Sequence, residues 1–345
     1  MRGLIGEEII VMKKAKSLIS RRLRSFGAIS SPLATSVALF VALPAYADNQ
    51  CHAQNLFAVV VHGGEISRRT VDNGRLAAMQ AALSRARAQL AANRSSLDVV
   101  EEIVRGFEDS GVFNAGRGAI ADAAGIVETD ASIMDGRDQR SGAVASMLTI
   151  KNPVHAARLV MEDSPHVLLV GDRGEAFVKK LGAETVAPDY FLHNAHTGAP
   201  EHGTVGAVAL DRCGHIAAAT STGGYDAKIP GRVGDSPIVG AGVYAEDGVA
   251  GFSATGHGEY FIRFSIAKDV SDRMAYAHQP MDEAMRTDIK QKLGQFPDAD
   301  GALIGIDAHG HVAMVWNSTG LFRGYATDTE APVVAEYDGP SASRR

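Results

Sequence analysis

Hydrophobic and polar positions alternate in blocks along the chain from residue 55 onward, as short apolar runs separated by amphipathic stretches. Short runs of β-branched and small apolar residues between turn formers are typical of buried strands. They predict strands at 55–62, 142–150, 166–170, 204–210, 216–220, 249–254, 302–307 and 311–316. Amphipathic or Ala-rich stretches predict helices at 72–93, 96–107, 153–162, 173–181, 260–276 and 282–293, with Ser96 as the N-cap of the second. Because strands and helices come in blocks rather than in strict βαβ alternation, the pattern favours an α+β layered sandwich over a doubly wound sheet.

Two segments break this pattern. The stretch 114–136 is rich in turn-forming residues. Residues 187–202 (APDYFLHNAHTGAPEH) show no periodicity and contain two prolines and three histidines, which predicts an exposed linker at about 187–203. The linker histidines His193, His196 and His202 have no fixed scaffold and no acidic or thiol ligand beside them, so we interpret them as solvated loop residues rather than a metal site.

The first 47 residues have the layout of a secretory signal peptide. An apolar run at 34–43 (ATSVALFVAL) is followed by Ala45-Tyr46-Ala47, which predicts cleavage after Ala47. The basic residues before the run are Lys13, Lys14, Lys16, Arg21, Arg22 and Arg24. The run is too short for a good transmembrane helix, which needs about 20 apolar residues. We therefore expect a periplasmic or secreted protein with no membrane anchor once the leader is removed, with a twin-arginine export route possible and translation starting at Met1 or Met12.

Composition narrows the choice of partner. The chain has 345 residues, of which 46% are hydrophobic and 21% charged, with a formal net charge of -6. Without a basic field or a Lys/Arg stripe, nucleic acid is not an expected partner. Cys51 and Cys213 are the only cysteines. An oxidising compartment would permit one bridge between them, but two unrelated thiols is the favoured interpretation.

Familiar enzyme motifs are absent from the sequence. Gly240-Ala-Gly-Val-Tyr-Ala245 fits a dinucleotide-binding fingerprint, but the turn Glu246-Asp247-Gly248 follows where that motif requires a helix. There is no G-x-S-x-G and no H-E-x-x-H, so serine hydrolase and zinc protease chemistry have no support.

One threonine stands out by its position. In 202–211 (HGTVGAVALD), Thr204 lies between the linker and an apolar strand, directly after Gly203. A threonine hydroxyl is a weak nucleophile without an adjacent base, and an N-terminal threonine carries its own base, an α-amino group with a pKa of about 7.7–8. The arrangement therefore works only if the Gly203–Thr204 bond is cut. Glycine tolerates the strained backbone that would expose its carbonyl to the neighbouring hydroxyl.

Blocks on both sides of Thr204 carry a family resemblance. They lie at 62–64 (HGG), 113–116 (FNAG), 129–136 (TDASIMDG), 220–224 (TSTGG), 230–237 (PGRVGDSP), 254–259 (ATGHGE) and 317–325 (NSTGLFRGY). Together with HGTVGAVALD, in this order, the blocks resemble the plant-type L-asparaginases, or isoaspartyl peptidases, which are N-terminal nucleophile hydrolases. The resemblance spans about residues 55–330.

The resemblance implies a fold and an activity. The fold is a four-layer αββα sandwich formed by one domain, 48–345. It is cut at Gly203–Thr204 into an α chain, 48–203, and a β chain, 204–345, which stay associated and pair into an (αβ)2 homodimer. The activity is hydrolysis of L-asparagine and isoaspartyl dipeptides, releasing L-aspartate. The chemistry requires no cofactor.

The resemblance also implies catalytic roles, each of which suits the chemistry of its residue. Thr204 would attack the side-chain carbonyl, Thr222 would orient it, and Asn114 would assist its placement. The hydroxyl of Thr255 and the N–H of Gly256 would form the oxyanion hole.

Two charged residues and one loop complete the implied site. Arg232 would bind the α-carboxylate of the substrate and Asp235 its α-ammonium group, although alone the two could be a local Arg–Asp loop pair. A structural Na+ would be held by backbone carbonyls of the segment 107–117. Those carbonyls belong to Phe107, Glu108, Ser110, Phe113, Ala115 and Arg117.

The sequence departs from the family pattern at three places. Glu65-Ile66 follows HGG where small residues are usual, Tyr225-Asp226 replaces a Met/Thr-Asn pattern after TSTGG, and the linker is short. These departures leave leaving-group preference and maturation efficiency open. The alternatives are a glycosylasparaginase-like amidase, which usually has an aspartate where this chain has Gly203, and an unprocessed periplasmic binder of aspartyl compounds.

Overall fold

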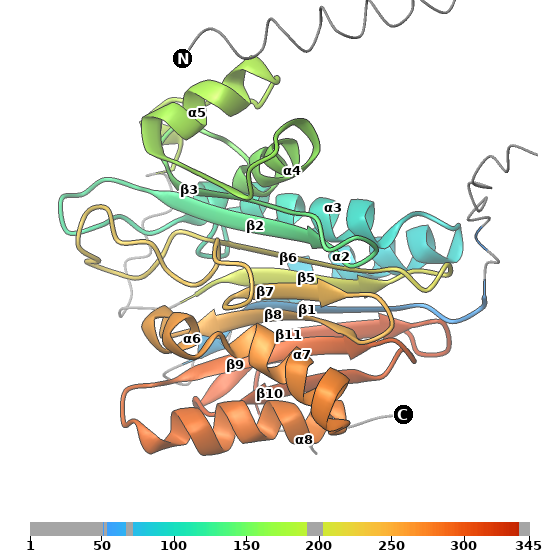
Figure 1. Cartoon of the computed structure of the whole chain (residues 1–345). Helices are drawn as coiled ribbons and strands as arrows, with labels where there is room; N and C mark the ends of the chain where they lie inside the picture. The colour runs from blue at the N-terminus through green and yellow to red at the C-terminus, as the bar shows by residue number, and fades with distance from the viewer. Residues whose placement is uncertain (1–50, 52–53, 67–71, 192–202, 338–345) are drawn as a thin grey trace, which may run out of the picture. The chain divides into compact units, whose positions relative to one another are not determined.

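Two β-sheets stack face to face at the centre of the fold (Figure 1). The larger sheet has the order β12-β11-β1-β5-β6-β2-β3-β4, and its neighbouring strands are antiparallel except β3 and β4. Its strands are β1 (Ala58–Ile66), β2 (Thr129–Asp135), β3 (Ser141–Met147), β4 (Leu168–Val170), β5 (Val205–Leu210), β6 (Ile216–Thr222), β11 (Gly320–Thr327) and β12 (Val333–Ala335). The smaller sheet, in the order β10-β9-β8-β7, consists of β7 (Val243–Glu246), β8 (Ala250–Gly256), β9 (Gly301–Asp307) and β10 (Val312–Trp316).

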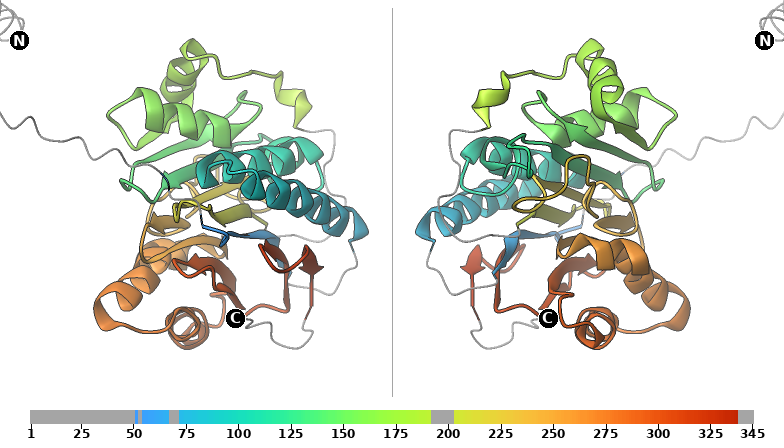
Figure 2. Two further views of the ribbon diagram at one scale, coloured as in Figure 1. Left: turned by 90° about the vertical axis from the view of Figure 1, so that its right-hand side faces the viewer. Right: turned by 90° about the vertical axis from the view of Figure 1, so that its left-hand side faces the viewer.

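Helices cover the outer faces of both sheets (Figures 1 and 2). The larger sheet packs against α2 (Asn73–Ala91), α3 (Ser96–Ser110) and α4 (Pro153–Asp163), with α5 (Gly171–Lys180) beside β3 and β4. The smaller sheet packs against α7 (Ile266–Ala277) and α8 (Met281–Arg286), and α6 (Gly258–Phe264) precedes α7. The predicted α+β class is confirmed, because one mixed and one antiparallel sheet are flanked by helices, and β3-α4-β4 is the one parallel crossover among the described strands.

The strands of the larger sheet are apolar on both faces because each face packs against another layer. On β1, Val59 and Val61 point into the core under the helices, whereas Ala58 and Val60 point into the core between the sheets. Side chains alternate between faces of a strand, so a strand buried on both sides reads as a continuous apolar run. This explains why β1 and β5 could be predicted from hydrophobicity alone.

Several predicted elements need correction. The turn-rich stretch before Gly136 contains β2, whose seven residues are all buried. Its polar side chains have internal partners: Ser132 donates to the carbonyl of Ser236 at 2.5 Å, and Asp130 accepts from the N–H of Ser146 at 2.8 Å.

Helix boundaries also differ from the prediction. The N-cap of α3 is Ser95, whose hydroxyl accepts from the N–H of Asp98, and not Ser96. The predicted helix 260–276 is broken at Ser265, which has a left-handed φ of 49°, into α6 and α7. Strands β7, β11 and β12 were not predicted.

Cys51 and Cys213 form a disulfide, so the expectation of two unrelated thiols is wrong. The segment before β1 runs along the turn between β5 and β6, where the N–H of Gln54 donates to the carbonyl of Arg212 at 2.7 Å. The two cysteines are 162 residues apart in sequence, and their proximity comes from the antiparallel pairing of β1 with β5.

The computed structural model describes residues 51, 54–66, 72–191 and 203–337. The predicted leader 1–47 and the linker histidines His193, His196 and His202 lie outside the described residues. Among the helices that are described, none has the length and apolar character of a membrane-spanning segment.

Candidate active site

Thr204 lies at the start of β5, the strand between β1 and β6 in the larger sheet. It is 6% exposed, and its hydroxyl donates to Oγ1 of Thr222 at 3.2 Å. Thr222 ends β6, next to the first pair of the β5–β6 ladder, Val205 with Ser221. The antiparallel pairing of two short apolar strands therefore places the two hydroxyls together.

The carbonyl oxygen of Gly203, directly before Thr204, accepts two hydrogen bonds. One comes from Nδ2 of Asn114 at 2.9 Å and the other from Oγ1 of Thr222 at 2.9 Å. Because the single proton of Thr222 goes to Gly203, its lone pairs accept from Thr204 and from the N–H of Gly224, the latter at 3.0 Å. The hydroxyl of Thr222 thus has one orientation, with Thr204 Oγ1 on one side and the Gly203 carbonyl on the other.

Asn114 is itself fixed from three directions. Its Nδ2 also donates to the carbonyl of Gly224 at 2.6 Å, and its Oδ1 accepts from the N–H of Ile120 at 3.0 Å. Its backbone carbonyl accepts from the N–H of Gly223 at 3.0 Å. These contacts bring the FNAG and TSTGG segments, far apart in sequence, to the same peptide bond.

The backbone conformation of Gly64 explains why the second residue after His62 is a glycine. Its φ is 104°, a conformation that L side chains rarely adopt. A Cβ built on Gly64 would lie 3.0 Å from Cα of Gly203 and 3.4 Å from the nitrogen of Thr204. The end of β1 therefore packs directly against the Gly203–Thr204 bond.

A buried polar chain lies behind β5. Nε2 of His62 contacts Oγ of Ser253 at 2.8 Å, Ser253 contacts Oγ1 of Thr220 at 2.7 Å, and Thr220 donates to the carbonyl of Gly242 at 3.1 Å. With Thr220 donating to Gly242, Ser253 donates to Thr220 and must accept from an Nε2–H of His62. Burial lowers the pKa of His62 to about 3, although a hydrogen bond with the backbone of Thr204 raises it by a smaller amount. The ring is therefore neutral. His62 and Thr220 belong to blocks that the sequence analysis singled out, whereas Ser253 does not.

Thr255 and Gly256 end β8 in the smaller sheet. The side chain of Thr255 is buried, and its Oγ1 has no hydrogen-bond partner among the described residues. Gly256 has a φ of 137°, and a Cβ there would clash with the backbone of Asp300 and Gly301. A buried hydroxyl with nothing to bond is what a site awaiting a ligand presents.

Arg232 and Asp235 adjoin one another but do not form the local pair that their spacing allows. Nε and Nη2 of Arg232 each donate to one carboxylate oxygen of Glu259, both at 3.0 Å. The guanidinium also stacks on Tyr225, 4.5 Å from the ring centroid. A Cβ on Gly258 would lie 2.6 Å from Oδ1 of Asp235 and 3.0 Å from Nη2 of Arg232, so only glycine fits between them.

Asp235 is buried, and its Oδ2 has no hydrogen-bond partner among the described residues. Burial raises the pKa of its carboxyl to about 7, and the charge of Arg232 acts in the opposite direction. The pairing of Arg232 with Glu259 was not predicted from the sequence, because nothing in ATGHGE identifies its glutamate as a partner for an arginine 27 residues earlier.

The predicted sodium loop follows α3, which ends at a left-handed Gly111. A Cβ on Gly118 would run into the carbonyl oxygens of Gly111 and Phe113, and one on Gly116 would lie 2.8 Å from the carbonyl oxygen of Glu108. Backbone carbonyls thus crowd around two glycines, and oxygen donors of this kind suit a hard cation. Within the described residues, no group of three or more His, Cys, Asp or Glu side chains is arranged to hold a metal ion.

The side chain of Glu108 has a different role from the one predicted for its carbonyl. Its Oε1 accepts from Oγ of Ser221 at 2.7 Å and from the N–H of Val154 at 3.0 Å. Burial raises the pKa of this carboxyl to about 8. Glu108 therefore links α3 and α4 to β6 directly beside Thr222, a contact that the sequence did not reveal.

Comparison with known proteins identifies the family of the chain. The model of a family described as asparaginase matches residues 55–199 and 192–336. The chain is 42% identical over 301 residues to an isoaspartyl peptidase from Escherichia coli K12, covering 79% of this chain and 94% of that protein. It is 39% identical over 297 residues to a plant-type L-asparaginase from Pyrobaculum calidifontis, covering 79% and 97%. The chain therefore belongs to the family of plant-type L-asparaginases and isoaspartyl peptidases.

Proposed function

We propose that the chain cleaves itself between Gly203 and Thr204 and then uses the new N-terminal threonine to hydrolyse β-aspartyl amide bonds. Its substrates are isoaspartyl dipeptides and L-asparagine, and its product is L-aspartate. One observation carries the proposal. The hydroxyl of Thr204 adjoins Thr222, and Thr222 together with Asn114 donates hydrogen bonds to the carbonyl oxygen of Gly203.

Self-cleavage begins when Oγ1 of Thr204 attacks the carbonyl carbon of Gly203. Negative charge develops on the Gly203 oxygen, where Asn114 and Thr222 already donate. The C–N bond then breaks, the hydroxyl proton ends on the threonine nitrogen, and an ester joins Gly203 to Oγ1. Water hydrolyses this ester, which leaves a carboxylate on Gly203 and a free amine and hydroxyl on Thr204.

Substrate hydrolysis uses the same hydroxyl with a different base. The free amine of Thr204 takes the hydroxyl proton as Oγ1 attacks the side-chain carbonyl of the β-aspartyl group. The hydroxyl of Thr255, which has no hydrogen-bond partner in the described part of the chain, and the N–H of Gly256 would stabilise the resulting oxyanion. The amine then returns the proton to the leaving amine, and water releases L-aspartate from the acyl-enzyme.

Recognition of the aspartyl head rests on the charged pair beside Gly258. Glu259 engages Nε and Nη2 of Arg232, which leaves Nη1 for the α-carboxylate of the substrate. The buried Oδ2 of Asp235 offers an acceptor for the α-ammonium group. A cation beside Asp235 would favour its ionised form, so substrate binding and ionisation support each other.

The proposal has three further parts, which concern a bound ion, the location of the protein and its assembly. The carbonyl-rich loop after α3 would hold Na+, which would stabilise the segment that carries Asn114 without taking part in the chemistry. The leader predicted at 1–47 would direct the protein to the periplasm or outside the cell. The cleaved α and β chains would pair as an (αβ)2 homodimer.

The test is replacement of the nucleophile. Thr204→Ala removes the attacking hydroxyl and should leave the purified chain uncleaved and inactive toward L-asparagine and β-aspartyl dipeptides. Thr204→Ser keeps a hydroxyl and should still cleave. Reducing gel electrophoresis measures cleavage, and N-terminal sequencing of the smaller fragment should begin at Thr204. Cleavage of Thr204→Ala at the same bond would refute the proposal.

A further inference from the structure

Glu65 is a buried carboxyl near the end of β1 that packs against the Gly203–Thr204 bond. It follows Gly64, which packs against Gly203 and the nitrogen of Thr204. The β1–β11 ladder is irregular between His62 and Glu65, and Glu65 pairs with Leu321 after this irregularity. Its side chain is 5% exposed.

The charged groups that act on Glu65 are carboxylates rather than cations. Burial raises its pKa to about 8, and the charges of Asp300 and Asp235 raise it further. Asp300 itself borders the expected oxyanion hole, because its carbonyl accepts from the N–H of His257 at 2.8 Å. Glu65 therefore directly follows a residue that packs against the scissile bond, and it interacts electrostatically with Asp235, the residue expected to bind the substrate's ammonium group.

Glu65 and Asp235 each have a buried carboxyl oxygen without a hydrogen-bond partner among the described residues. These oxygens are Oε2 of Glu65 and Oδ2 of Asp235, and both side chains are at least nine-tenths buried. Buried carboxyl oxygens without donors are unfavourable unless a ligand supplies the missing hydrogen bonds. An ammonium group has three N–H donors and one positive charge, so it would donate to both oxygens and favour the ionised form of both carboxyls.

We infer that Glu65 is a second carboxyl ligand for the α-ammonium group of the substrate, alongside Asp235, and thus a specificity determinant for β-aspartyl compounds with a free amine. The inference rests on the proposed function for the identity of the substrate. With two acceptors, the subsite selects more strongly against substrates that lack the amine than one aspartate would.

The experiment compares ligands that differ only in the amine. L-Aspartate, the proposed product, carries the α-ammonium group, and succinate lacks it. Binding of each is measured by calorimetry on the matured wild type and on Glu65→Gln, which keeps the shape of the side chain and removes its charge. We expect Glu65→Gln to weaken L-aspartate binding roughly tenfold, the size of one charge-assisted hydrogen bond, and to leave succinate binding unchanged.

Further measurements on Glu65→Gln distinguish a loss of substrate binding from a disturbance of the catalytic residues. KM for a β-aspartyl dipeptide should rise by the same factor while kcat and self-cleavage stay at wild-type values, and Glu65→Asp should restore part of the affinity. Glu175→Gln is the matched control. Glu175 on α5 is equally buried, and within the described residues its hydrogen bonds join it to Leu148, Thr149 and Lys179 rather than to any residue of the candidate site. Equal weakening of L-aspartate and succinate, or tighter L-aspartate binding by Glu65→Gln, overturns the inference. Failure of the wild type to hydrolyse any substrate refutes the proposed function instead, and the two binding constants remain measurable.

A second observation carries an independent inference: the disulfide joins segments on opposite sides of the Gly203–Thr204 bond. Cys51 belongs to the proposed α chain and Cys213 to the proposed β chain. Arg212 clamps the segment after Cys51, since its Nε donates to the carbonyl of Gln54 at 2.6 Å.

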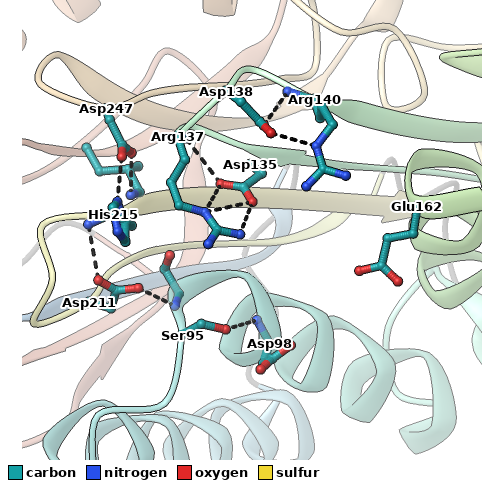
Figure 3. Close-up of polar contacts among 12 residues, drawn as sticks. Ser95, Asp98, Asp135, Arg137, Asp138, Arg140, Glu162, Asp211, His215 and Asp247 are labelled. Carbon is teal, nitrogen blue, oxygen red and sulfur yellow. Dashed lines mark hydrogen bonds and ion pairs between the residues drawn. The ribbon is translucent and has the colours of Figure 1, made fainter. Parts of the chain in front are cut away.

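The turn that carries Cys213 is held from several sides (Figure 3). Oδ1 of Asp211 accepts from the N–H groups of Cys213 at 2.9 Å and His215 at 3.1 Å, and its Oδ2 accepts from the N–H of Ser96 at 2.9 Å. Nδ1 of His215 contacts Oδ2 of Asp247 at 2.7 Å. The turn that carries Cys213 is therefore held by residues from both sides of the Gly203–Thr204 bond, and none of these contacts involves that bond itself.

We infer that Cys51–Cys213 becomes a covalent link between the α and β chains after self-cleavage. Such a link keeps the two fragments at a high effective concentration even when they are diluted or partly unfolded. It also fits the oxidising compartment that the leader predicts. The inference rests on the self-cleavage part of the proposed function.

Gel electrophoresis with and without reductant tests the link. We expect one full-length band without reductant and two smaller bands with it, and Cys51→Ser should give two bands in both lanes. Two bands from the wild type without reductant would overturn the link but not self-cleavage. A single band from the wild type with reductant would refute self-cleavage itself. Free-thiol counting on the unfolded, unreduced protein then reports the bridge separately, with no free thiol if it has formed.

Discussion

Asn114→Ala is expected to slow self-cleavage about 10²–10³-fold, because it removes one of two donors from the oxygen on which charge develops. In the intact chain, Nδ2 of Asn114 lies 2.9 Å from the carbonyl oxygen of Gly203. A preorganised donor of this kind lowers the barrier by about 2.7–4 kcal/mol. The other donor, Thr222, stays in place, so cleavage should be slowed rather than abolished.

The same substitution also destabilises the fold, and this effect must be separated from catalysis. It leaves the carbonyl of Gly224 and the N–H of Ile120 without their present partner. An unpaired buried polar group costs about 1–3 kcal/mol. A domain is stable by about 5–15 kcal/mol, so the precursor should remain folded with a lower urea midpoint.

The assay follows the loss of precursor over time on reducing gels after synthesis in vitro, and a single exponential gives the cleavage rate. Asn152→Ala is the control, because Asn152 is a similarly buried asparagine that donates to Asp109 rather than to Gly203. Thr222→Val should slow cleavage at least as much as Asn114→Ala, since it also removes the acceptor for Thr204. If Asn114→Ala cleaves at the wild-type rate while its stability falls, Asn114 is only structural and the reasoning fails.

Arg232→Ala should leave self-cleavage intact, because the scissile bond has no free α-carboxylate, and should reduce kcat/KM about 30-fold or more, the cost of losing one partner of a charge pair; loss of processing would instead show that Arg232 is structural. Thr255→Val should lower kcat about 10²–10³-fold with normal maturation, as measured by steady-state kinetics on the cleaved enzyme, and an unchanged kcat would exclude its hydroxyl from the oxyanion hole. The kcat/KM of matured enzyme should fall as pH drops through about 7, where Asp235 takes up a proton and loses its charge for the ammonium group. The Thr204 amine adds a second limb near pH 8, where it too must be neutral to act, and a pH–rate profile with Asp235→Asn should retain only that limb.

The sheet strands that could be predicted are those whose side chains are apolar on both faces. In β5, Val205 and Ala207 lie in one core and Val208 lies in the other, so the run reads as continuous hydrophobicity. By contrast, β2 is buried but rich in polar residues, and some of these bond to residues distant in sequence, as Ser132 does to Ser236 and Asp130 to Ser146. Hydrophobic periodicity does not reveal such partners, so the sequence pattern predicts turns where the structure has this strand.

The candidate site likewise has one part that the sequence predicts and one part that it does not. Thr204 could be found from local chemistry, because a hydroxyl, a preceding glycine and a following strand are adjacent in sequence. Its contacts could not be derived, since Asn114 and Thr222 reach Gly203 only through the pairing of strands and loops far apart in the chain. The disulfide and the Arg232–Glu259 pair were missed for the same physical reason: both depend on tertiary proximity without a sequence signature.

The two proposed reactions share one nucleophile but would use different hydrogen-bond donors. The oxygen of Gly203 accepts from Asn114 and Thr222, whereas Thr255 on β8, in the other sheet, has a buried hydroxyl with no hydrogen-bond partner among the described residues. Two carbonyls attacked by the same hydroxyl would thus be stabilised by different donors, one set from the loop before β2 and the end of β6, and the other from the end of β8. A donor that acts only in self-cleavage has no oxyanion left to stabilise once Gly203 has become a C-terminal carboxylate. It follows that Asn114→Ala, given time to mature fully, should turn over β-aspartyl dipeptides with a much smaller defect than its cleavage rate shows. Equal defects in both reactions would mean that a single set of donors serves both.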